Sequence, residues 1–290
     1  MKGWLTVNGF MRNAKFDDIS DLLIKAGRRH GIELQLQYSS QIAADIYLRK
    51  DRDPSVDFVL FYDKDTYLAR QMELLGMPVF NSSKAIALCD SKALTYLRLK
   101  ELGIPTIESI LSPITYEHVG YPSFDFVKEA GRRLGYPFVI KEEYGSMGMQ
   151  VYLVHDEAEA IHVIEKLANK RFLMQKYIAS SNGADWRIHV ADGNISACIR
   201  RYSTDGDFRS NVSLGGSTQA FIPTKEMAEL AVSAADAMGL LFAGVDIMMA
   251  EDKPIITEVN SNPHFRSALD AAGIDFADAI MDAIINRMHA

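Results

Sequence analysis

The stretch PIITEVNSNP, residues 254–263, combines an apolar run with side chains that could bind a metal ion. Side chains alternate between the two faces of a strand, so Glu258, Asn260 and Asn262 are expected on one face and Val259 in a core. Magnesium prefers oxygen ligands and usually takes one or two carboxylates, leaving other positions to water and phosphate oxygens. Taken alone, a strand that ends in a polar turn closed by proline explains these residues equally well.

A second acidic residue lies in the preceding apolar run, LLFAGVDIMMA at 240–250, which reads as a buried strand carrying Asp246. A lone buried carboxylate is costly unless it is paired or bound to metal. The turn EDK at 251–253 joins the two runs as a hairpin, which would place Asp246 on a strand beside Glu258. Asp246, Glu258 and Asn260 are therefore predicted to form a magnesium site, with Mn²⁺ as the alternative ion.

A glycine-containing hairpin could bind phosphate. The sequence YPFVIKEEYGSMGMQVYLV at 136–154 reads as a strand carrying Lys141, a loop at 145–148 and a second strand. Such a loop directs backbone N–H groups and a hydroxyl toward an anion, and the lysine supplies a positive charge. The hairpin lacks a Walker motif, and read alone it is better explained as an ordinary glycine turn with a solvent-facing lysine.

Several arginines follow within two short segments. GADWRIHVADGNISACIRRYS contains Arg187, Arg200 and Arg201 around a hairpin turn at Asp192-Gly193, and GDFRSNVSLGG contains Arg209. Guanidinium groups suit carboxylates and phosphates. Solvated charges on strand faces are the alternative, which we favour for Arg200.

Composition limits the class of protein. The chain has 290 residues, of which 48% are hydrophobic and 24% charged, as in soluble globular proteins with more than one lobe. Its formal net charge of −7 argues against general nucleic-acid binding, although a local basic cleft stays open. We see no long apolar span and no signal peptide, which favours a cytoplasmic location without membrane contact. Cys89 and Cys198 are expected to be small core residues without a disulfide.

The positioning elements can be read from the hydrophobic pattern. The first eighty residues alternate strand-like and helix-like runs, which predicts a small, mostly parallel sheet with covering helices. No G-x-G-x-x-G follows the first strand, so no dinucleotide is expected there. DSKALTYLRLKELGIP at 90–105 is predicted to be an amphipathic helix, and SPITYEHVGYPSFD at 112–125 a loop.

Seven motifs together resemble those of the ATP-grasp ligases, specifically the RimK-like branch. In chain order they are D-x-K near residue 90, a strand lysine followed by a G-S-x-G loop, Q-x-Y-I, D-x-R, GDFRSN, GVDI and E-V-N. Each motif is weak alone, but their shared order along nearly the whole chain is specific. The resemblance implies a mixed α/β and α+β ATP-grasp fold. An N-terminal α/β domain would span 1–84, and two α+β lobes at 85–172 and 173–290 would hold ATP between them.

The resemblance also implies a reaction. ATP would phosphorylate a substrate carboxylate, and an amine would attack the acyl phosphate to form an amide, releasing ADP and phosphate. An amino acid such as glutamate would be added to a small molecule, peptide or protein. Dimers or tetramers are expected on the same grounds. The alternatives are a phosphotransferase that stops at phosphorylation and a non-catalytic nucleotide-binding scaffold; retention of the costly buried acid argues against the scaffold.

Residue roles follow by resemblance. Lys92 and Lys141 would contact the ATP phosphates under the 145–148 loop, main-chain groups at 176–178 would hold adenine, and Asp185 the ribose. The full predicted ATP set is Lys92, Lys141, Gly145, Ser146, Gly148, Gln175, Lys176, Tyr177, Ile178, Asp185, Arg209, Ser210 and Asn211. The predicted catalytic residues are Arg201, Arg209 and Asn211. Of these, Arg201 would steady the acyl phosphate or the oxyanion.

The sequence departs from the family pattern at three places. Lys176 stands where the Q-E-Y-I motif has glutamate, and Gln150 replaces the third loop glycine. SNPHFRSALDAAG follows E-V-N in place of a small-residue S-P-G turn, which alters the expected acceptor pocket. The predicted substrate residues are Arg187, Asn262 and Arg266; for Arg266, a surface role is an equal alternative.

Overall fold

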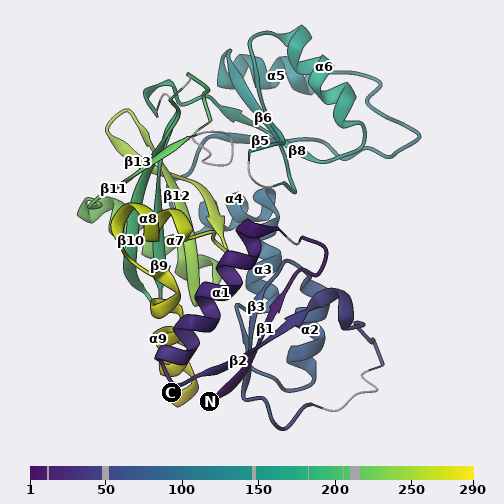
Figure 1. The fold of residues 1–290 in the computed structure, drawn as a ribbon. Coiled ribbons are helices and arrows are strands. Elements are labelled where there is room, and N and C mark those ends of the chain that lie inside the picture. Colours follow the sequence, from purple (N-terminus) through teal and green to yellow (C-terminus); the bar gives the residue numbers. More distant parts are fainter. Residues whose placement is uncertain (12, 48–51, 146–147, 182, 205, 210–215) are drawn as a thin grey trace.

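A computed structural model describes residues 1–11, 13–47, 52–145, 148–181, 183–204, 206–209 and 216–290 (Figure 1). Three sheets form the scaffold, one N-terminal, one central and one C-terminal. They lie within the predicted divisions 1–84, 85–172 and 173–290 except for the last strand of the central sheet, and the domain boundaries themselves stay a prediction. Mixed helices and strands in several sheets confirm the predicted fold class.

The N-terminal sheet is parallel with the strand order β2-β1-β3-β4, as the alternating sequence pattern predicted. Its strands are β1 (Lys2–Val7), β2 (Glu33–Tyr38), β3 (Phe58–Tyr62) and β4 (Val79–Phe80), and its helices are α1 (Ala14–Arg29), the short η1 (Ser39–Gln41) and α2 (Thr66–Leu74). Residues of β3 alternate between two cores. Phe58 and Leu60 pack with α1, whereas Val59 and Phe61 pack with α2.

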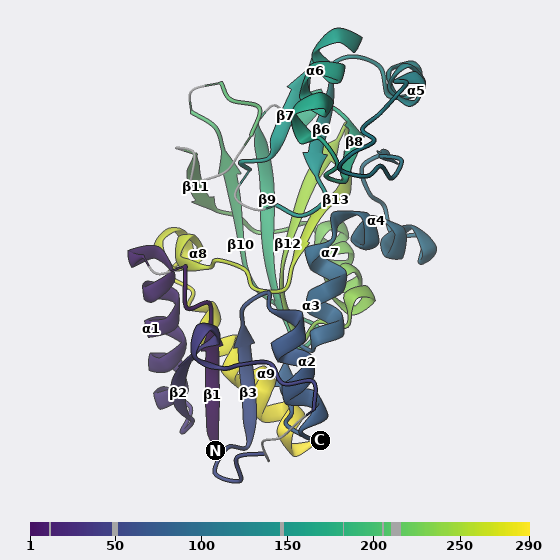
Figure 2. The ribbon, with the colours of Figure 1, turned by 90° about the vertical axis from the view of Figure 1, so that its right-hand side faces the viewer.

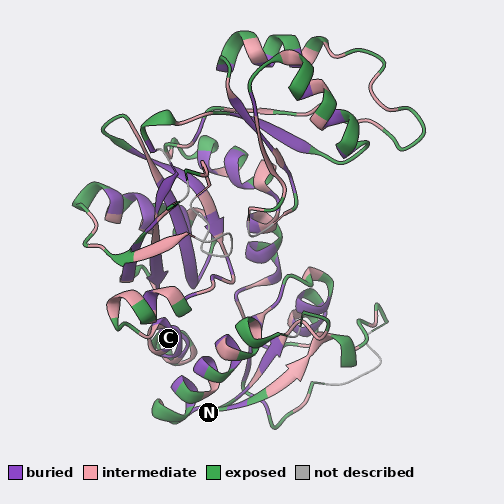
Figure 3. Cartoon of the chain, turned by 45° about the horizontal axis from the view of Figure 1, so that its top comes forward, coloured by how far each residue is buried: buried purple, intermediate pink, exposed green. Residues whose placement is uncertain are grey.

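The central sheet is antiparallel with the order β5-β8-β6-β7. Its strands are β5 (Ser109–Leu111), β6 (Phe138–Glu142), β7 (Val151–Val154) and β8 (Phe172–Lys176); α5 (Asp125–Leu134) and α6 (Glu157–Leu167) lie against it at the top of Figure 1. Buried residues follow its strands, while both helices expose their outer faces (Figure 3). The helices cover one face, which leaves the other face available for a cleft.

The C-terminal sheet is antiparallel with the order β11-β10-β9-β12-β13. Its strands are β9 (Ala184–Ala191), β10 (Asn194–Tyr202), β11 (Ser217–Ala220), β12 (Phe242–Ala250) and β13 (Lys253–Asn260), preceded by η2 (Ala179–Ser181). The predicted hairpin is confirmed, because Asp246 of β12 is the direct register partner of Glu258 of β13. Val259 is buried in the core, as strand alternation predicted.

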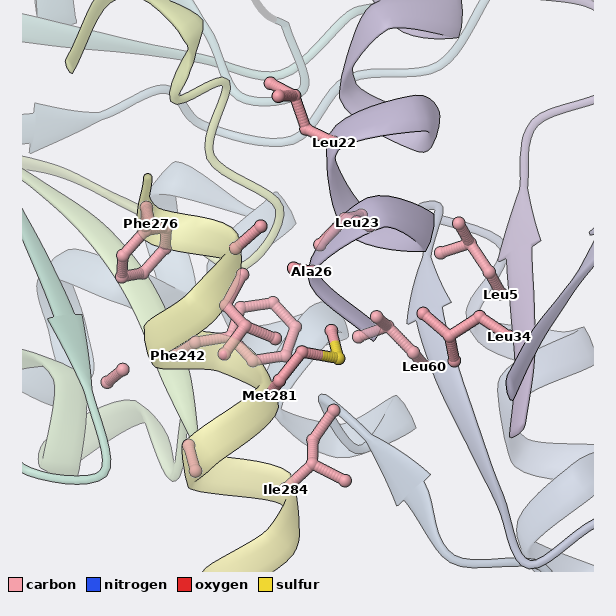
Figure 4. Packing of buried hydrophobic residues seen from close by; sticks show 14 of the residues in the cluster. Leu5, Leu22, Leu23, Ala26, Leu34, Leu60, Phe242, Phe276, Met281 and Ile284 are labelled. Carbon is pink, nitrogen blue, oxygen red and sulfur yellow. The ribbon is translucent and has the colours of Figure 1, made fainter. Parts of the chain in front are cut away.

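Helices join the three sheets into one molecule (Figure 2). They are α3 (Ser83–Asp90), α4 (Lys92–Glu101), α7 (Lys225–Met238), α8 (Arg266–Ala272) and α9 (Phe276–His289). The C-terminal α9 packs against α1, and Figure 4 shows Met281 and Ile284 of α9 in one core with Leu23 of α1, Leu60 of β3 and Phe242 of β12. This core fixes the N-terminal sheet against the C-terminal sheet.

The two cysteines are buried and free, which confirms the prediction that they are core residues without a disulfide. Within the described ranges, no helix has the length and apolar character needed to cross a membrane.

Candidate active site

A first cleft lies between the central and C-terminal sheets, with an empty volume of about 960 Å³. Its lining brings together most of the predicted nucleotide and catalytic residues and two of the three predicted metal ligands, but not Asn260. These residues are Lys92, Lys141, Gly145, Gly148, Gln175, Lys176, Tyr177, Ile178, Asp185, Arg201, Arg209, Asp246 and Glu258. The predicted Ser146, Ser210 and Asn211 lie outside the residues that the structure describes. Residues from dispersed motifs therefore meet at one concave surface.

Strand alternation directs Lys141 into this cleft. Phe138 and Ile140 face the core under α5 and α6, whereas Val139 and Lys141 face the cleft. Burial lowers the pKa of Lys141 below the ordinary lysine value, and the nearby Glu258 opposes that shift. The lysine is thus a partly desolvated cation facing a space that could hold an anion.

Two basic side chains hold the hairpin loop from opposite ends. Lys92 donates from Nζ to the carbonyl of Gly145 at 2.7 Å, and Arg209 donates from Nη1 to the carbonyl of Gly148 at 3.1 Å. The backbone N–H of Lys92 also donates to the carbonyl of Glu143 at 3.2 Å, which ties the start of α4 to the end of β6. Gly145, Gly148 and both cations therefore lie together in one wall of the cleft.

A buried ion-pair network crosses β9, β10 and β12. Arg187 donates from Nε and Nη2 to the two carboxylate oxygens of Asp246, both at 2.7 Å. Arg201 donates from Nε and Nη2 to Asp185 at 2.6 and 2.5 Å, and its Nη2 lies 2.9 Å from Asp246. Burial opposes ionisation of Asp246, but the two guanidinium groups outweigh it and hold the pKa of this carboxyl well below its usual range.

The three predicted metal ligands differ in the hydrogen bonds and ion pairs that their side chains make. Asp246 is occupied by the two arginines, whereas the side chain of Glu258 makes no hydrogen bond or ion pair with the described residues. Asn260 donates its amide N–H to the carbonyl of Gly244 at 3.3 Å, which leaves its side-chain oxygen available. No cluster of three or more His, Cys, Asp or Glu side chains suited to a metal occurs among the described residues. Two carboxylates and one amide oxygen still fit magnesium that takes its other ligands from phosphate and water.

A second, open cavity, with an empty volume of about 1570 Å³, lies where the N-terminal sheet and α1 meet the C-terminal sheet. It shares Arg201 and Glu258 with the first cleft. Its other polar lining residues are Asn8, Lys15, Asp17, Ser20, Tyr38, Tyr62, Asp63, Lys64, Arg187, Asn260, Asn262, His264 and Ser267. The two cavities therefore meet at one cation and one carboxylate.

Sequence reasoning missed the N-terminal wall of this second cavity. Asn8 directly follows β1, and Asp63 and Lys64 directly follow β3. Ligands of parallel sheets bind beyond the carboxyl ends of the strands, so these positions carried a usable signal.

The predicted substrate residues separate into two groups. Arg187 and Asn262 line the second cavity, and Asn262 donates from Nδ2 to the carbonyl of Asp63 at 2.7 Å. Arg266 lies outside the lining of both cavities and is exposed. Its guanidinium pairs with Asp18 at 2.9 Å and Asp270 at 2.8 Å, which matches the surface role that the sequence left open.

His189 is a fully buried residue of β9, and its ring packs on Phe276 at 4.8 Å between centroids. Burial, together with the charge of Arg187, lowers the pKa of His189 to about 3. The unfolded chain therefore binds a proton below the ordinary pKa of about 6.5 that the folded chain does not bind, so stability falls as pH decreases through this window.

We expect His189→Phe to weaken the acid sensitivity of folding. Between pH 6.5 and pH 5, the free energy of unfolding should decrease by about 2 kcal/mol less in the variant than in the parent protein. Urea unfolding at several pH values measures this difference. His162→Phe, at an exposed helix position, is the matched control and should keep the parent pH dependence; an unchanged slope in His189→Phe would contradict the assignment.

The sequence is similar to a known protein family and to several curated proteins. The model of the RimK-like ATP-grasp domain matches residues 96–284. The chain is 35% identical over 230 residues to "Probable alpha-L-glutamate ligase" of Methanococcoides burtonii, covering 78% of this chain and 72% of that protein. It is 30% identical over 251 residues to human "N-acetylaspartylglutamate synthase A", covering 84% of this chain and 61% of that protein.

Solved structures share the fold. The RimK domain ATP-grasp protein of Sphaerobacter thermophilus superposes with a TM-score of 0.75 and 21% identity, covering 98% of this chain and 99% of that one. D-alanine–D-alanine ligase of Bacillus anthracis complexed with ATP gives a TM-score of 0.71 at 20% identity, covering 100% and 97% of the two chains.

Proposed function

The chain belongs to the RimK-like ATP-grasp family, and from this premise we propose that it joins a carboxylate to an amine through an acyl phosphate, with release of ADP and phosphate. It is an ATP-grasp ligase, as its named relatives are. The observation that supports the proposed chemistry best is that the two cavities share Arg201 and Glu258. Beside these two residues, a phosphate group bound in the first cleft could contact a carboxylate bound in the second cavity.

The first cleft would bind ATP. Lys92, Lys141 and Arg209 would neutralise its phosphates beside Gly145 and Gly148. Main-chain groups at 176–178 would hold adenine. Asp185 is engaged by Arg201 in this structure, so a contact with the ribose would use an oxygen lone pair beyond that ion pair.

Asp246, Glu258 and Asn260 would hold magnesium, or manganese, beside the terminal phosphates. The ion would offset phosphate charge and orient the terminal phosphate. Basic side chains of the protein would neutralise the rest of the phosphate charge. Arg201 lines both cavities, so it would contact the phosphoryl group during its transfer from ATP in the first cleft to the carboxylate in the second cavity.

The carboxylate substrate would lie in the second cavity near Arg187 and Asn262. Its oxygen attacks the terminal phosphorus of ATP, and the bond to ADP breaks. A neutral amine then attacks the acyl carbon, the carbon–oxygen bond to phosphate breaks, and the proton lost from nitrogen passes to solvent or phosphate. Arg201 would stabilise the negative charge on the acyl oxygen in this step. No nucleophilic side chain is needed.

The names of relatives point to an amino acid as the amine, glutamate among them, joined to a small molecule, peptide or protein. A cytoplasmic location and a homodimer or homotetramer stay predictions.

Tyr62, Asp63 and His264 add polar groups to the second cavity, and these groups could recognise the ammonium and carboxylate groups of an amino-acid substrate.

Incubation of the purified protein with ATP, Mg²⁺ and an amino-acid panel tests the function, with nucleotides and amides followed by mass spectrometry. ADP together with a new amide is the expected result. ADP with a phosphorylated compound and no amide would favour the phosphotransferase, AMP would contradict the acyl-phosphate mechanism, and lack of turnover with peptides and proteins included would favour the scaffold.

Lys141→Met is expected to weaken ATP binding. The variant keeps the aliphatic stem but removes a cation that faces the cleft, so the dissociation constant should rise about 10- to 100-fold. Calorimetric titration with ATP and Mg²⁺ measures the change. Lys176→Met is the matched control, because that exposed lysine is assigned a main-chain contact; equal losses in both variants would contradict the role of Lys141.

A further inference from the structure

The Arg187–Asp246 ion pair crosses the boundary between the two cavities. Asp246 belongs to the lining of the first cleft but not of the second, and Arg187 to the second but not the first. Both carboxylate oxygens of Asp246 accept from Arg187, at 2.7 Å each. A residue assigned to the metal and a residue assigned to the substrate thus neutralise each other.

The two arginines on Asp246 are not equivalent. Arg201 donates two hydrogen bonds to Asp185 at 2.6 and 2.5 Å, so it keeps a buried carboxylate if Asp246 turns to another cation. Arg187 pairs only with Asp246 among the described residues. Arg187 is therefore the arginine that loses its partner when Asp246 binds a metal ion.

Loss of that partner is costly in this environment. The side chain of Arg187 is 13% exposed and that of Asp246 4% exposed, and a buried charge needs a partner. The other basic groups near Arg187 include Arg201, which shares Asp246 with it, and Lys15, His189 and His264, whose pKa values the charge of Arg187 helps to lower. A basic group cannot replace Asp246. The carboxylates of Asp17, Asp63 and Glu258 line the same cavity, but none of them contacts Arg187 in the structure, so an anion that enters the cavity is the partner that we assign to the released guanidinium.

We propose that Arg187 changes partner during the reaction cycle: a divalent cation with the nucleotide displaces it from Asp246, and the released guanidinium binds the substrate carboxylate. This inference rests on the proposed function. It makes Arg187 a substrate-binding residue whose availability depends on the metal. Because coupling between two sites is reciprocal, the metal–nucleotide complex and the carboxylate strengthen each other's binding.

Nuclear magnetic resonance of arginine Nε–H groups tests the exchange directly in the full chain. Arg187→Lys and Arg201→Lys assign the two resonances by their disappearance. Without ligand, both Nε–H groups should be protected from solvent exchange by their carboxylates. Saturation with Mg²⁺ and ADP should shift the Arg187 signal and remove that protection, whereas Arg201 stays protected by Asp185. Inorganic phosphate, added next as the anion probe, should shift the Arg187 signal a second time.

Calorimetry on the same sample separates the outcomes. If Mg²⁺ and ADP bind while the Arg187 signal stays protected and unshifted, the exchange is wrong and the proposed function stands. If Mg²⁺ and ADP do not bind, the nucleotide assignment is wrong, and the inference fails with it.

Manganese affinity gives an independent readout without turnover. In the presence of ADP, Arg187→Met should bind Mn²⁺ about tenfold more tightly by electron paramagnetic resonance, a coupling of ordinary size between two sites. Arg200→Met is the matched control, because it removes the same charge from the neighbouring strand β10. The exposed Arg200 guanidinium lies over Trp186 and Tyr202 and does not contact Asp246, so this variant should keep the parent affinity. Unchanged affinity in Arg187→Met, or an equal gain in both variants, would overturn the proposal.

Discussion

Glu258→Ala is expected to abolish magnesium-dependent ADP formation while the fold stays intact. Glu258 lines both cavities and lies opposite Asp246, so its loss would remove a carboxylate from the point where phosphate charge is neutralised. Removal of one preorganised group at such a point costs about a thousandfold in turnover. Stability should change little, because the side chain of Glu258 makes no hydrogen bond or ion pair with the described residues.

The measurement is ADP formation at saturating ATP and Mg²⁺, with circular dichroism and the urea midpoint as tests of folding. Glu251→Ala is the matched control, since Glu251 is exposed in the turn of the same hairpin. Normal turnover in Glu258→Ala would refute the metal assignment, and equal losses in both variants would indicate a general effect on the hairpin.

The hairpin that carries Glu258 could be predicted because strand alternation is a local property. Buried Val259 and half-buried Glu258 and Asn260 follow directly from the period of two. The short turn sets the register only as far as Ile247 opposite Ile256, and a register shift between Ile247 and Asp246 brings Asp246 opposite Glu258, which the local pattern does not predict. The parallel N-terminal sheet was predictable for a similar reason, since alternating strands and helices leave few arrangements.

The partner of Asp246 could not be predicted in the same way. The sequence indicated only that a buried acid needs a cation. Arg187 reaches it because β9 lies beside β12 in the sheet, although β10, β11 and α7 separate those strands along the chain. The pairing is thus decided by strand order, which local patterns do not contain.

Prediction of the second cavity would require knowledge of contacts between parts of the chain that lie even farther apart in the sequence. Its N-terminal wall follows β1 and β3, whereas its opposite wall comes from β9 and β13. The two walls are held together by the core in which α9 returns to α1, and by the hydrogen bond from the Tyr62 hydroxyl to the carbonyl of Pro263 at 2.6 Å. The sequence motifs indicate the nucleotide cleft because the residues that line it belong to those motifs. The substrate cavity depends instead on how the N-terminal sheet packs against the C-terminal sheet, which the motifs do not contain.

Arg201→Met is expected to lose both stability and turnover. The substitution leaves Asp185 as a buried carboxylate without its two hydrogen bonds, although Asp246 keeps Arg187. Breaking a buried ion pair on one side costs about 3–5 kcal/mol in the free energy of unfolding. Urea unfolding measures this loss, and ADP formation well below the unfolding transition measures catalysis in molecules that remain folded.

The double variant Asp185→Leu with Arg201→Met separates these two effects. Replacing both members of a buried pair by apolar side chains is often nearly neutral, so much of the lost stability should return. Turnover should not return, because the guanidinium shared by the two cavities is still missing. Recovery of turnover together with stability would mean that Arg201 only supports the fold, and the phosphoryl group would then be stabilised by Lys92, Lys141, Arg209 and the metal ion without it.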